Sequence, residues 1–163
     1  FLNPVNVLKA ADVKIGQSIL EVGCGTGFFT ISAAKIIGDQ GSLIAMDVST
    51  NFLEEVSKRV HQAQLNNVSI EQRDALNTEL CSGSVEKVLL FGVIPFPLLP
   101  LDRLLPEMHR VLEPGGTISI WLFPPFVHLW VPIAIHRSGL FTLINRKGQM
   151  YNFKKRSIEE KTK

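Results

Sequence analysis

The chain has 163 residues, of which 45% are hydrophobic and 20% charged, and its formal net charge is +2. This length suits one domain with a hydrophobic core rather than two, and the small charge gives no support for a nucleic-acid partner. The two cysteines, Cys24 and Cys81, are no disulfide framework and are typical of a reducing compartment, so we expect a cytoplasmic protein. We expect one domain over residues 1–153 and a basic tail over 154–163.

The predicted elements begin with a short helix over residues 5–11 and a strand over 18–22. The strand runs into Glu21-Val22-Gly23-Cys24-Gly25-Thr26-Gly27, and a helix-forming stretch over 28–37 follows at once. Glycine permits a sharp turn and a close approach of the backbone to a ligand. The N–H groups at the start of the next helix favour a carboxylate or phosphate. The segment therefore predicts a loop that binds a nucleotide-type ligand.

Two kinds of nucleotide loop compete for this segment. A dinucleotide loop needs the spacing G-x-G-x-x-G, and Phe28 occupies the place of its last glycine. Glu21 adds a negative charge near the pocket floor, which suits a cationic ligand group better than a pyrophosphate. The residues EVGCGTG instead resemble motif I of the class I S-adenosylmethionine-dependent methyltransferases.

A second strand and a second helix come next. Residues 42–46 are a continuous apolar run that ends at Asp47, which is typical of a parallel strand covered on both faces. Ser49 or Thr50 is the expected cap of a helix that Asn66-Asn67 stops. Its expected buried face consists of Phe52, Val56, Val60 and Ala63.

The second half of the chain continues the alternation. Residues 68–72 and 85–91 predict the third and fourth strands, and a helix with an apolar stripe follows from Leu101 to Leu112. Pro114-Gly115-Gly116 is expected to end that helix. We then expect a strand, an apolar helix and two hairpin strands, over residues 117–123, 126–137, 141–146 and 149–153.

The uncharged stretch over residues 117–135 approaches the length of a transmembrane helix. It contains three prolines and His128, so a buried strand followed by an apolar helix explains it better. We expect no transmembrane span. Contact of residues 121–130 and of Lys154-Lys155-Arg156 with a membrane surface stays open.

These elements predict an α/β fold: a Rossmann-like, doubly wound, mostly parallel seven-stranded sheet with a C-terminal antiparallel hairpin. In such sheets ligands bind at the carboxyl ends of the strands. The glycine loop, Asp47, Asp74 and the segment after Phe91 all fall at such ends. We therefore expect them to share one pocket.

Two aspartates at strand ends are candidate ligand-binding groups. Asp47 could accept hydrogen bonds from both hydroxyls of a ribose, although a helix cap with Ser49 is the alternative. Asp74, in Arg73-Asp74-Ala75, could accept from an adenine amino group, and an ordinary turn aspartate is its alternative.

The resemblance to class I methyltransferases extends beyond the glycine loop. Asp74-Ala75 matches the adenine motif, and Arg110-Val111-Leu112-Glu113-Pro114-Gly115-Gly116 looks like the R-V-L-K-P-G-G signature of the superfamily. The most similar group includes the ubiquinone and menaquinone biosynthesis methyltransferases of methyltransferase type 11. The resemblance implies a single S-adenosylmethionine-binding methyltransferase domain over residues 1–153, with the family's N-terminal cover short or missing.

The same resemblance implies which residues hold the cofactor. Glu21 and the glycine loop would hold the methionine end of S-adenosylmethionine, Asp47 the ribose and Asp74 with Ala75 the adenine, while Phe91-Gly92 would line the methyl-transfer side. The full set implied is Glu21, Gly23, Cys24, Gly25, Thr26, Gly27, Asp47, Val48, Asp74, Ala75, Phe91 and Gly92.

The implied reaction is an in-line methyl transfer, which needs positioning and exclusion of water more than a strong acid or base. We expect a small, apolar or aromatic acceptor, because the expected walls are Ile94, Phe96, Trp121, Phe123, Phe126 and Trp130. No catalytic residue is identified. His128 and His136 are candidates for a general base, being eight residues apart and so on one face of the expected helix, although partly exposed helix positions explain them more simply.

Other functions stay open. A catalytically silent cofactor-binding or partner subunit fits the short cover and the absence of a convincing base. A nicotinamide oxidoreductase is disfavoured by Phe28 and by the lack of a catalytic tyrosine-lysine pair. Nucleic-acid methylation is disfavoured because no D-P-P-Y-like motif follows the fourth strand. No histidine, cysteine and carboxylate cluster has metal-ligand spacing, so we expect no metal. The oligomeric state is left open.

Overall fold

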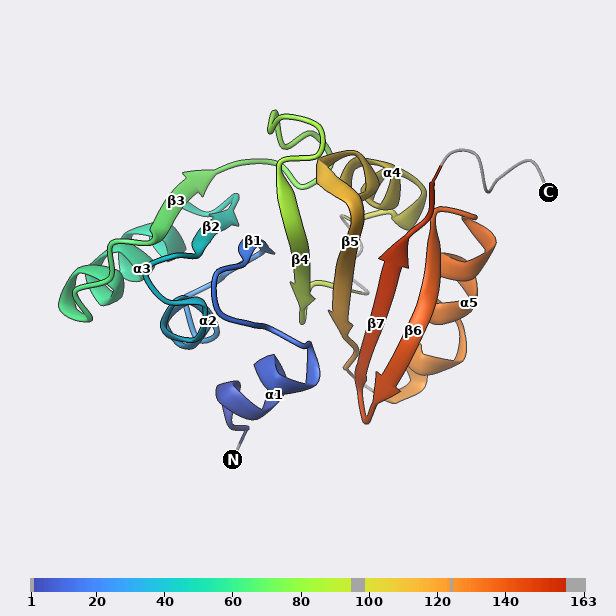
Figure 1. The fold of residues 1–163 in the computed structure, drawn as a ribbon, viewed down its shortest axis with the longest axis horizontal. Helices are drawn as coiled ribbons and strands as arrows, with labels where there is room; N and C mark the ends of the chain where they lie inside the picture. The colour runs from blue at the N-terminus through green and yellow to red at the C-terminus, as the bar shows by residue number, and fades with distance from the viewer. Residues whose placement is uncertain (1, 95–98, 124, 158–163) are drawn as a thin grey trace.

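The fold is a seven-stranded sheet with helices on both faces (Figure 1). We describe it from a computed structural model for residues 2–94, 99–123 and 125–157. The strand order is β3-β2-β1-β4-β5-β7-β6. The strands are β1 Ser18–Val22, β2 Ser42–Asp47, β3 Val68–Gln72, β4 Val85–Phe91, β5 Leu112–Trp121, β6 Phe141–Lys147 and β7 Met150–Lys155.

The first five strands are mutually parallel, and β7 is antiparallel to both of its neighbours, β5 and β6. The predicted fold class, a mostly parallel doubly wound sheet with a C-terminal antiparallel hairpin, is therefore confirmed. The strand order changes direction between β1 and β4, which is where ligands bind in sheets of this kind.

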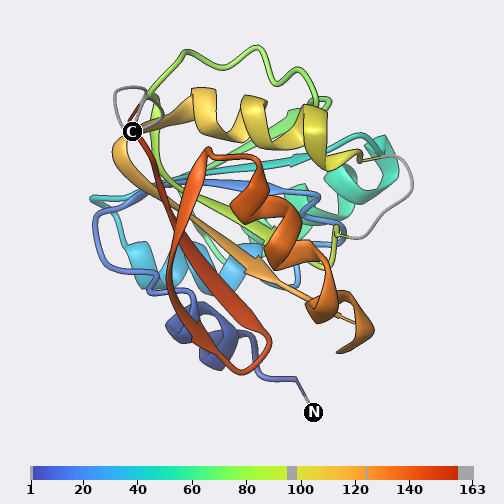
Figure 2. The same cartoon turned by 90° about the vertical axis from the view of Figure 1, so that its right-hand side faces the viewer.

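The helices in the described ranges form two layers. They are α1 Pro4–Ala10, α2 Thr30–Ile37, α3 Thr50–Gln62, α4 Leu101–Val111, the 3₁₀ helix η1 Pro125–Leu129 and α5 Val131–Arg137. α1, α2 and α3 pack on the face that carries Ile19 and Ala45, whereas α4 and α5 pack on the face that carries Leu20 and Val88. Figure 2 shows α2 and α4 on opposite sides of the sheet.

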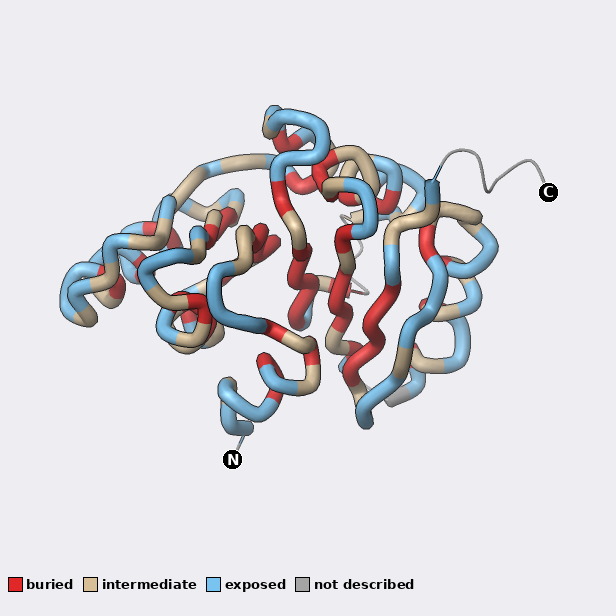
Figure 3. The backbone as a smooth tube through the Cα atoms, viewed as in Figure 1, coloured by how far each residue is buried: buried red, intermediate tan, exposed pale blue. Residues whose placement is uncertain are grey.

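Both faces of the central strands are covered, which explains why their sequences are continuous apolar runs. Leu20 and Leu89 point to opposite faces, and each is fully buried. Burial is concentrated in the central strands (Figure 3), whereas the outer strand β6 exposes Leu143 and Ile144. No helix within the described ranges has the length and apolarity to cross a bilayer.

Two sequence predictions about α3 are wrong. The helix ends at Gln62, before Asn66-Asn67, because Gln64 adopts a left-handed φ of 54° that breaks the helical path. Phe52 is 44% exposed and does not join the buried face, where Leu53 lies beside Val56 instead. The shift by one residue frees the Phe52 ring for the pocket described below.

The expected continuous helix over residues 126–137 is also wrong. The structure has η1 followed by α5, with Trp130 between them at φ −127°. In a continuous helix, Pro132 would offer no N–H to the carbonyl of His128 and its ring would clash there. Instead Pro132 lies in the first turn of α5, where a missing N–H costs nothing.

Strands β5 and β7 start or end differently from the prediction. β5 already begins at Leu112, but the ladder shifts register between Val85 and Lys87, so regular pairing starts at Thr117 as predicted. β5 then ends at Trp121, and β7 continues to Lys155, two residues into the expected tail.

Candidate functional site

A cavity of about 520 Å³ opens at the carboxyl ends of β1, β2 and β4, beside the turn after β3. It brings together seven of the twelve residues predicted for the cofactor site. These are Gly23, Gly25, Asp47, Val48, Asp74, Ala75 and Gly92. The described residues that line it and were not predicted are Val22, Met46, Ser49, Phe52, Arg73, Leu76, Val93 and Leu99.

The glycine loop is fixed by its backbone. The N–H groups of Gly23 and Cys24 both donate to the Met46 carbonyl, at 2.9 and 3.0 Å, which ties the loop to β2. Gly23 has a φ of +67°, and a Cβ there would lie 2.4 Å from Cγ1 of Val93. Only glycine fits this position without strain.

Gly25 and Gly92 are required for a different reason. Both have a left-handed φ, +53° and +73°, and a Cβ on either would meet no protein atom within 4 Å. Because both residues line the cavity, their missing side chains leave backbone exposed to whatever fills it. At Gly25, this open space allows the close backbone approach that the three-glycine pattern predicts.

Asp47 ends β2 and lies between the glycine loop and α3. Its Oδ2 accepts a hydrogen bond from the Gly25 N–H and its Oδ1 accepts one from the Ser49 N–H, each at 3.0 Å. Ser49 is the N-cap of α3. Asp47 therefore also supports a helix cap, which is the alternative role that we considered for it. Each carboxylate oxygen has two lone pairs, which leaves acceptor capacity toward the cavity.

Asp74 lies in the turn after β3. Its Oδ1 accepts from the Leu76 N–H at 2.8 Å, the pattern of an Asx turn. Arg73 before it pairs with Glu71 and donates to the Thr78 carbonyl at 2.6 Å, so the turn is held from both sides. Asp74 thus has the turn role that its alternative predicts, and it also lines the cavity.

Five predicted residues do not line the cavity: Glu21, Cys24, Thr26, Gly27 and Phe91. The Thr26 carbonyl accepts from Arg59 at 2.8 Å, and a Cβ on Gly27 would lie 3.2 Å from Val56, so these two residues connect the loop to α3. Phe91 packs edge to face on Phe29, with ring centroids 5.0 Å apart.

Glu21 is a buried carboxyl group directly before the loop. It is 3% exposed, and its Oε2 accepts from the Thr30 hydroxyl at 2.6 Å. Burial raises its pKa to about 7, and the hydrogen bond from Thr30 opposes that shift. Near neutral pH, Glu21 is therefore divided between its neutral and ionised forms.

Cys24 is a free, buried thiol in the glycine loop. Burial and the nearby charges of Glu21 and Asp47 raise the pKa of its thiol to about 12. A thiol with such a pKa stays protonated at physiological pH, so Cys24 is a small loop residue rather than a nucleophile.

The two candidate histidines lie outside the cavity. Nδ1 of His128 is 3.1 Å from the Tyr151 hydroxyl, and burial with the nearby Arg146 charge lowers the pKa of His128. His136 is exposed on α5. The break at Trp130 places them on separate helices, so the expected shared face does not exist.

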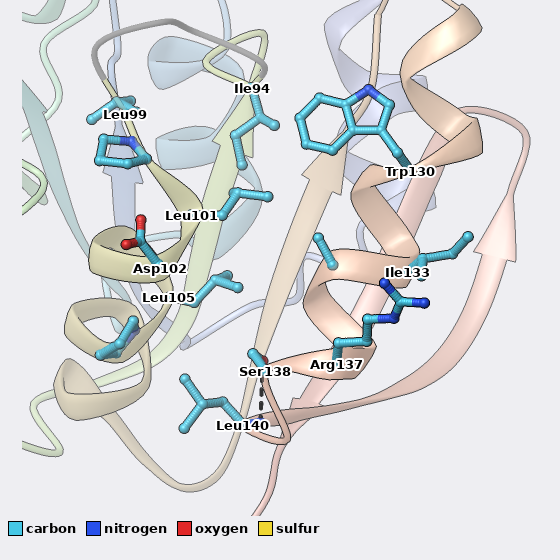
Figure 4. A pocket seen from close by; sticks show the side chains of 13 residues that line it. Ile94, Leu99, Leu101, Asp102, Leu105, Trp130, Ile133, Arg137, Ser138 and Leu140 are labelled. Carbon is cyan, nitrogen blue, oxygen red and sulfur yellow. Dashed lines mark hydrogen bonds between the residues drawn. The ribbon is translucent and has the colours of Figure 1, made fainter.

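The expected aromatic walls are only partly brought together. Ile94 and Trp130 line a second, larger groove between α4 and α5, of about 1200 Å³ (Figure 4). Trp121 stacks on Phe123 at 6.2 Å between centroids, and Phe126 is 63% exposed. Phe96 falls outside the described residues.

Several residues that line the cavity could not be predicted from the sequence. Phe52 follows the helical spacing of a core residue, and Val93 and Leu99 belong to an irregular segment after β4. Among the residues placed by the structure, no group of three or more histidine, cysteine or carboxylate side chains could hold a metal ion.

Curated relatives share sequence with this chain. The demethylmenaquinone methyltransferase of Shouchella clausii is 34% identical over 114 residues, which are 69% of this chain and 48% of that protein. The one of Staphylococcus saprophyticus is 38% identical over 115 residues, 69% of this chain and 47% of that protein. The chain thus spans about half the length of these relatives.

Solved structures share the fold. An S-adenosylmethionine-dependent methyltransferase from Aquifex aeolicus superposes with a TM-score of 0.77 at 22% identity, covering 94% of this chain and 88% of that one. The [4+2]-cyclase SpnF superposes with a TM-score of 0.72 at 17% identity, covering 87% of this chain and 58% of that one. Likeness at these identities shows a common fold, which can serve more than one chemistry.

A protein-family model matches the part of the chain that forms the cavity. The family described as methyltransferase domain matches residues 19–116, more than half of the 163 residues, and this range includes the glycine loop, Asp47, Asp74 and Gly92. The predicted resemblance is therefore confirmed, and the chain belongs to the methyltransferase domain family.

Proposed function

We propose that the protein binds S-adenosylmethionine and transfers its methyl group to a small, apolar or aromatic acceptor. The observation that carries this proposal is the single cavity shared by the glycine loop, Asp47, Asp74-Ala75 and Gly92, which lie on separate strand ends. Residues 1–155, through the end of β7, would form the cofactor-binding domain, in a protein of the reducing cytoplasm.

The described residues fit the cofactor in three places. Asp47 keeps lone pairs for ribose hydroxyls while it holds Gly25 and Ser49. Asp74 and Ala75 would contact the adenine, and the exposed Phe52 ring lines the same cavity. The left-handed Gly25 and Gly92 leave space for the ligand against bare backbone.

Glu21 would serve the methionine end from inside the fold. Its carboxyl group has a pKa of about 7 because burial disfavours the charged form. A cationic ammonium group brought near it would lower that pKa and favour the carboxylate. Thr26 and Gly27 would help indirectly, by fixing the loop to α3.

S-Adenosylmethionine, when bound, would supply a methyl group on a positively charged sulfur, and the proton released by the acceptor would pass to solvent. The chain's own part is to orient and to exclude water. The cavity walls are largely apolar, and its titratable lining residues in the described ranges are Asp47, Arg73 and Asp74. Their hydrogen bonds to loop and turn groups support a role in binding rather than in proton transfer.

A quinone-type ring is the acceptor class that we favour. The relatives above carry the name demethylmenaquinone methyltransferase, and the groove beside the cavity is lined mainly by apolar side chains. Contact with a membrane surface is compatible with this acceptor, since Phe126, Leu129 and Trp130 are 63%, 76% and 45% exposed.

The test is methyl transfer from radiolabelled S-adenosylmethionine to a panel of hydroxylated aromatic compounds, with a charged peptide and an RNA as comparison acceptors. We expect label in at least one aromatic compound and none in the peptide or the RNA. Cofactor binding without transfer to any acceptor would support a catalytically silent subunit instead.

A further inference from the structure

We propose that Glu107 and Arg110 of α4 are positioning residues for the adenine end of the cofactor cavity, because they hold the turn that carries Asp74. This inference rests on the proposed function, since it assigns residues outside the cavity to the placement of one of its lining groups. Neither Glu107 nor Arg110 lines the cavity. Both would therefore act through the turn and not by touching the cofactor.

The turn that carries Asp74 has little regular structure of its own. It belongs to residues 73–84, which lie between β3 and β4 and form no helix or strand. The Asn77 N–H donates to the Asp74 carbonyl at 3.1 Å, and the same two residues form an isolated bridge. A segment without a helix or a strand ladder must satisfy its polar groups by other contacts. The position of this turn relative to the cavity therefore depends on contacts with the rest of the fold.

Thr78 is the residue that attaches this segment to α4, beside which it passes in both views of the fold (Figures 1 and 2). Thr78 is fully buried, and its N–H and its hydroxyl both donate to Oε1 of Glu107, at 2.8 and 2.6 Å. Its carbonyl accepts from Nη1 of Arg73 at 2.6 Å, and Arg73 directly precedes Asp74. The contacts of one buried threonine thus connect α4 to the residue next to Asp74.

Arg110 holds the Glu107 carboxylate in place. Its Nε and Nη2 donate to the two carboxylate oxygens at 2.9 and 2.7 Å, which is a bidentate pair within α4. Its Nη1 donates to the Leu80 carbonyl at 2.7 Å and to the Ser82 hydroxyl at 3.1 Å, so the same guanidinium also binds the segment beyond Thr78. The hydrogen bonds from Arg110 lower the pKa of Glu107 to about 2, so this carboxylate stays ionised near neutral pH.

Removal of the Glu107 carboxylate would leave two donors of a fully buried residue, the N–H and the hydroxyl of Thr78, without their acceptor. Unsatisfied buried donors are costly, so the segment would shift to find other partners. Because Arg73 bonds to the Thr78 carbonyl, this shift would pass to the neighbouring Asp74. The expected result is a displaced Asp74 carboxylate in an otherwise intact cavity.

The experiment measures how strongly the protein prefers adenine. Calorimetric titrations compare S-adenosylhomocysteine with S-inosylhomocysteine, in which a carbonyl oxygen replaces the amino group that would donate to Asp74. Because two acceptors cannot form a hydrogen bond, we expect wild type to bind the adenosyl compound at least about tenfold more tightly. The ratio of the two affinities does not depend on the fraction of folded protein, so a variant that is merely less stable keeps the wild-type ratio.

Two variants test the attachment of the turn. Glu107→Ala removes the acceptor of Thr78 and places a strong helix former inside α4. It should reduce the preference for the adenosyl compound to within about threefold. Thr78→Val removes only the hydroxyl and should reduce the preference by a smaller factor, and it decides the question if Glu107→Ala does not fold.

A double-mutant cycle shows whether the effect passes through Asp74. Asp74→Ala should reduce the preference at least as far as Glu107→Ala does. Combining the two substitutions should change the ratio by less than about twofold relative to Asp74→Ala, because both remove the same contact. Independent, multiplied losses of preference would contradict the proposed route through the turn.

Glu86→Ala is the matched control. Oε2 of Glu86 likewise accepts from both the N–H and the hydroxyl of one residue, Ser18, at 2.7 and 3.2 Å. Ser18 begins β1, whereas the cavity opens at the other end of that strand. Glu86→Ala should therefore keep the wild-type preference for the adenosyl compound even if it lowers stability.

The outcomes separate this inference from the proposed function. An unchanged ratio in folded Glu107→Ala, or in Thr78→Val where Glu107→Ala does not fold, overturns the inference. An equal loss of preference in Glu86→Ala also overturns it, as does a wild-type ratio near one together with tight binding of S-adenosylhomocysteine. Failure of wild type to bind S-adenosylhomocysteine at all would overturn the proposed function, and this inference with it.

Discussion

The cofactor cavity and the α4–α5 groove are neighbours, yet they are built in different ways. The cavity depends on backbone, with Gly23, Gly25 and Gly92 at left-handed φ and Asp47 bonded to main-chain N–H groups. The groove depends on apolar side chains of two helices. A site made of backbone geometry permits few residues at each position, whereas a groove made of side chains tolerates many apolar substitutions.

The same contrast appears in the family match. Residues 19–116 include the cavity and α4, but α5 lies beyond them. One wall of the groove therefore belongs to the part of the chain that the family does not define. The family match therefore covers the whole lining of the cavity and only part of the lining of the groove.

The largest expected effect comes from the most constrained backbone position of the cavity. Gly23→Ala introduces a Cβ at a φ of +67° and 2.4 Å from Val93. Left-handed alanine and local overpacking together should lower the free energy of unfolding by about 3 kcal/mol. Urea denaturation measures this change, and calorimetry should show loss of S-adenosylmethionine binding.

Gly16→Ala is the matched control for Gly23→Ala. Gly16 has a φ of +80°, and a Cβ there would meet nothing within 4 Å. It should cost about 1 kcal/mol from backbone conformation alone and leave cofactor binding intact. Equal effects of the two substitutions would show that the contact with Val93 is unimportant.

A smaller effect is expected from the buried acid next to the loop. The folded-state pKa of Glu21 is raised to about 7 from 4.5, so between these values the folded protein keeps a proton that the unfolded chain loses. Stability is therefore lost as pH rises, by about 2 kcal/mol between about pH 5 and 7. Glu21→Gln, which stays neutral, should remove this loss.

The measurement for Glu21 is urea denaturation of both proteins across that pH range. Glu54→Gln, at an exposed position of α3, controls for the removal of a carboxylate. A wild-type protein whose stability rises with pH relative to Glu21→Gln would contradict the assignment of burial as the dominant cause.

The sequence predicts the parts of the cavity that depend on backbone geometry, but few of the apolar side chains that line the cavity and the groove. The glycine spacing and the position of Asp47 at a strand end depend on local geometry, so the sequence pattern predicts them. Phe52 was misplaced because helical periodicity cannot distinguish a core face from a pocket face one residue away. The groove was missed because it requires the packing of α4 against α5.

The break between η1 and α5 also could not be predicted from local composition. The apolar composition of residues 126–137 predicts a helix, but Pro132 decides where the helix starts. The pairing of His128 with Tyr151 of β7 is a contact between segments 23 residues apart, which no local pattern contains.

The most direct test of the cofactor site is calorimetric titration of wild type, Asp47→Ala and Asp39→Ala with S-adenosylmethionine and S-adenosylhomocysteine. Asp39 is an exposed aspartate outside the cavity, and its variant serves as the control. We predict binding to wild type and Asp39→Ala, with affinity lowered at least about tenfold in Asp47→Ala, as loss of charge-assisted hydrogen bonds requires. Equal affinity in all three proteins would contradict the placement of the cofactor in this cavity.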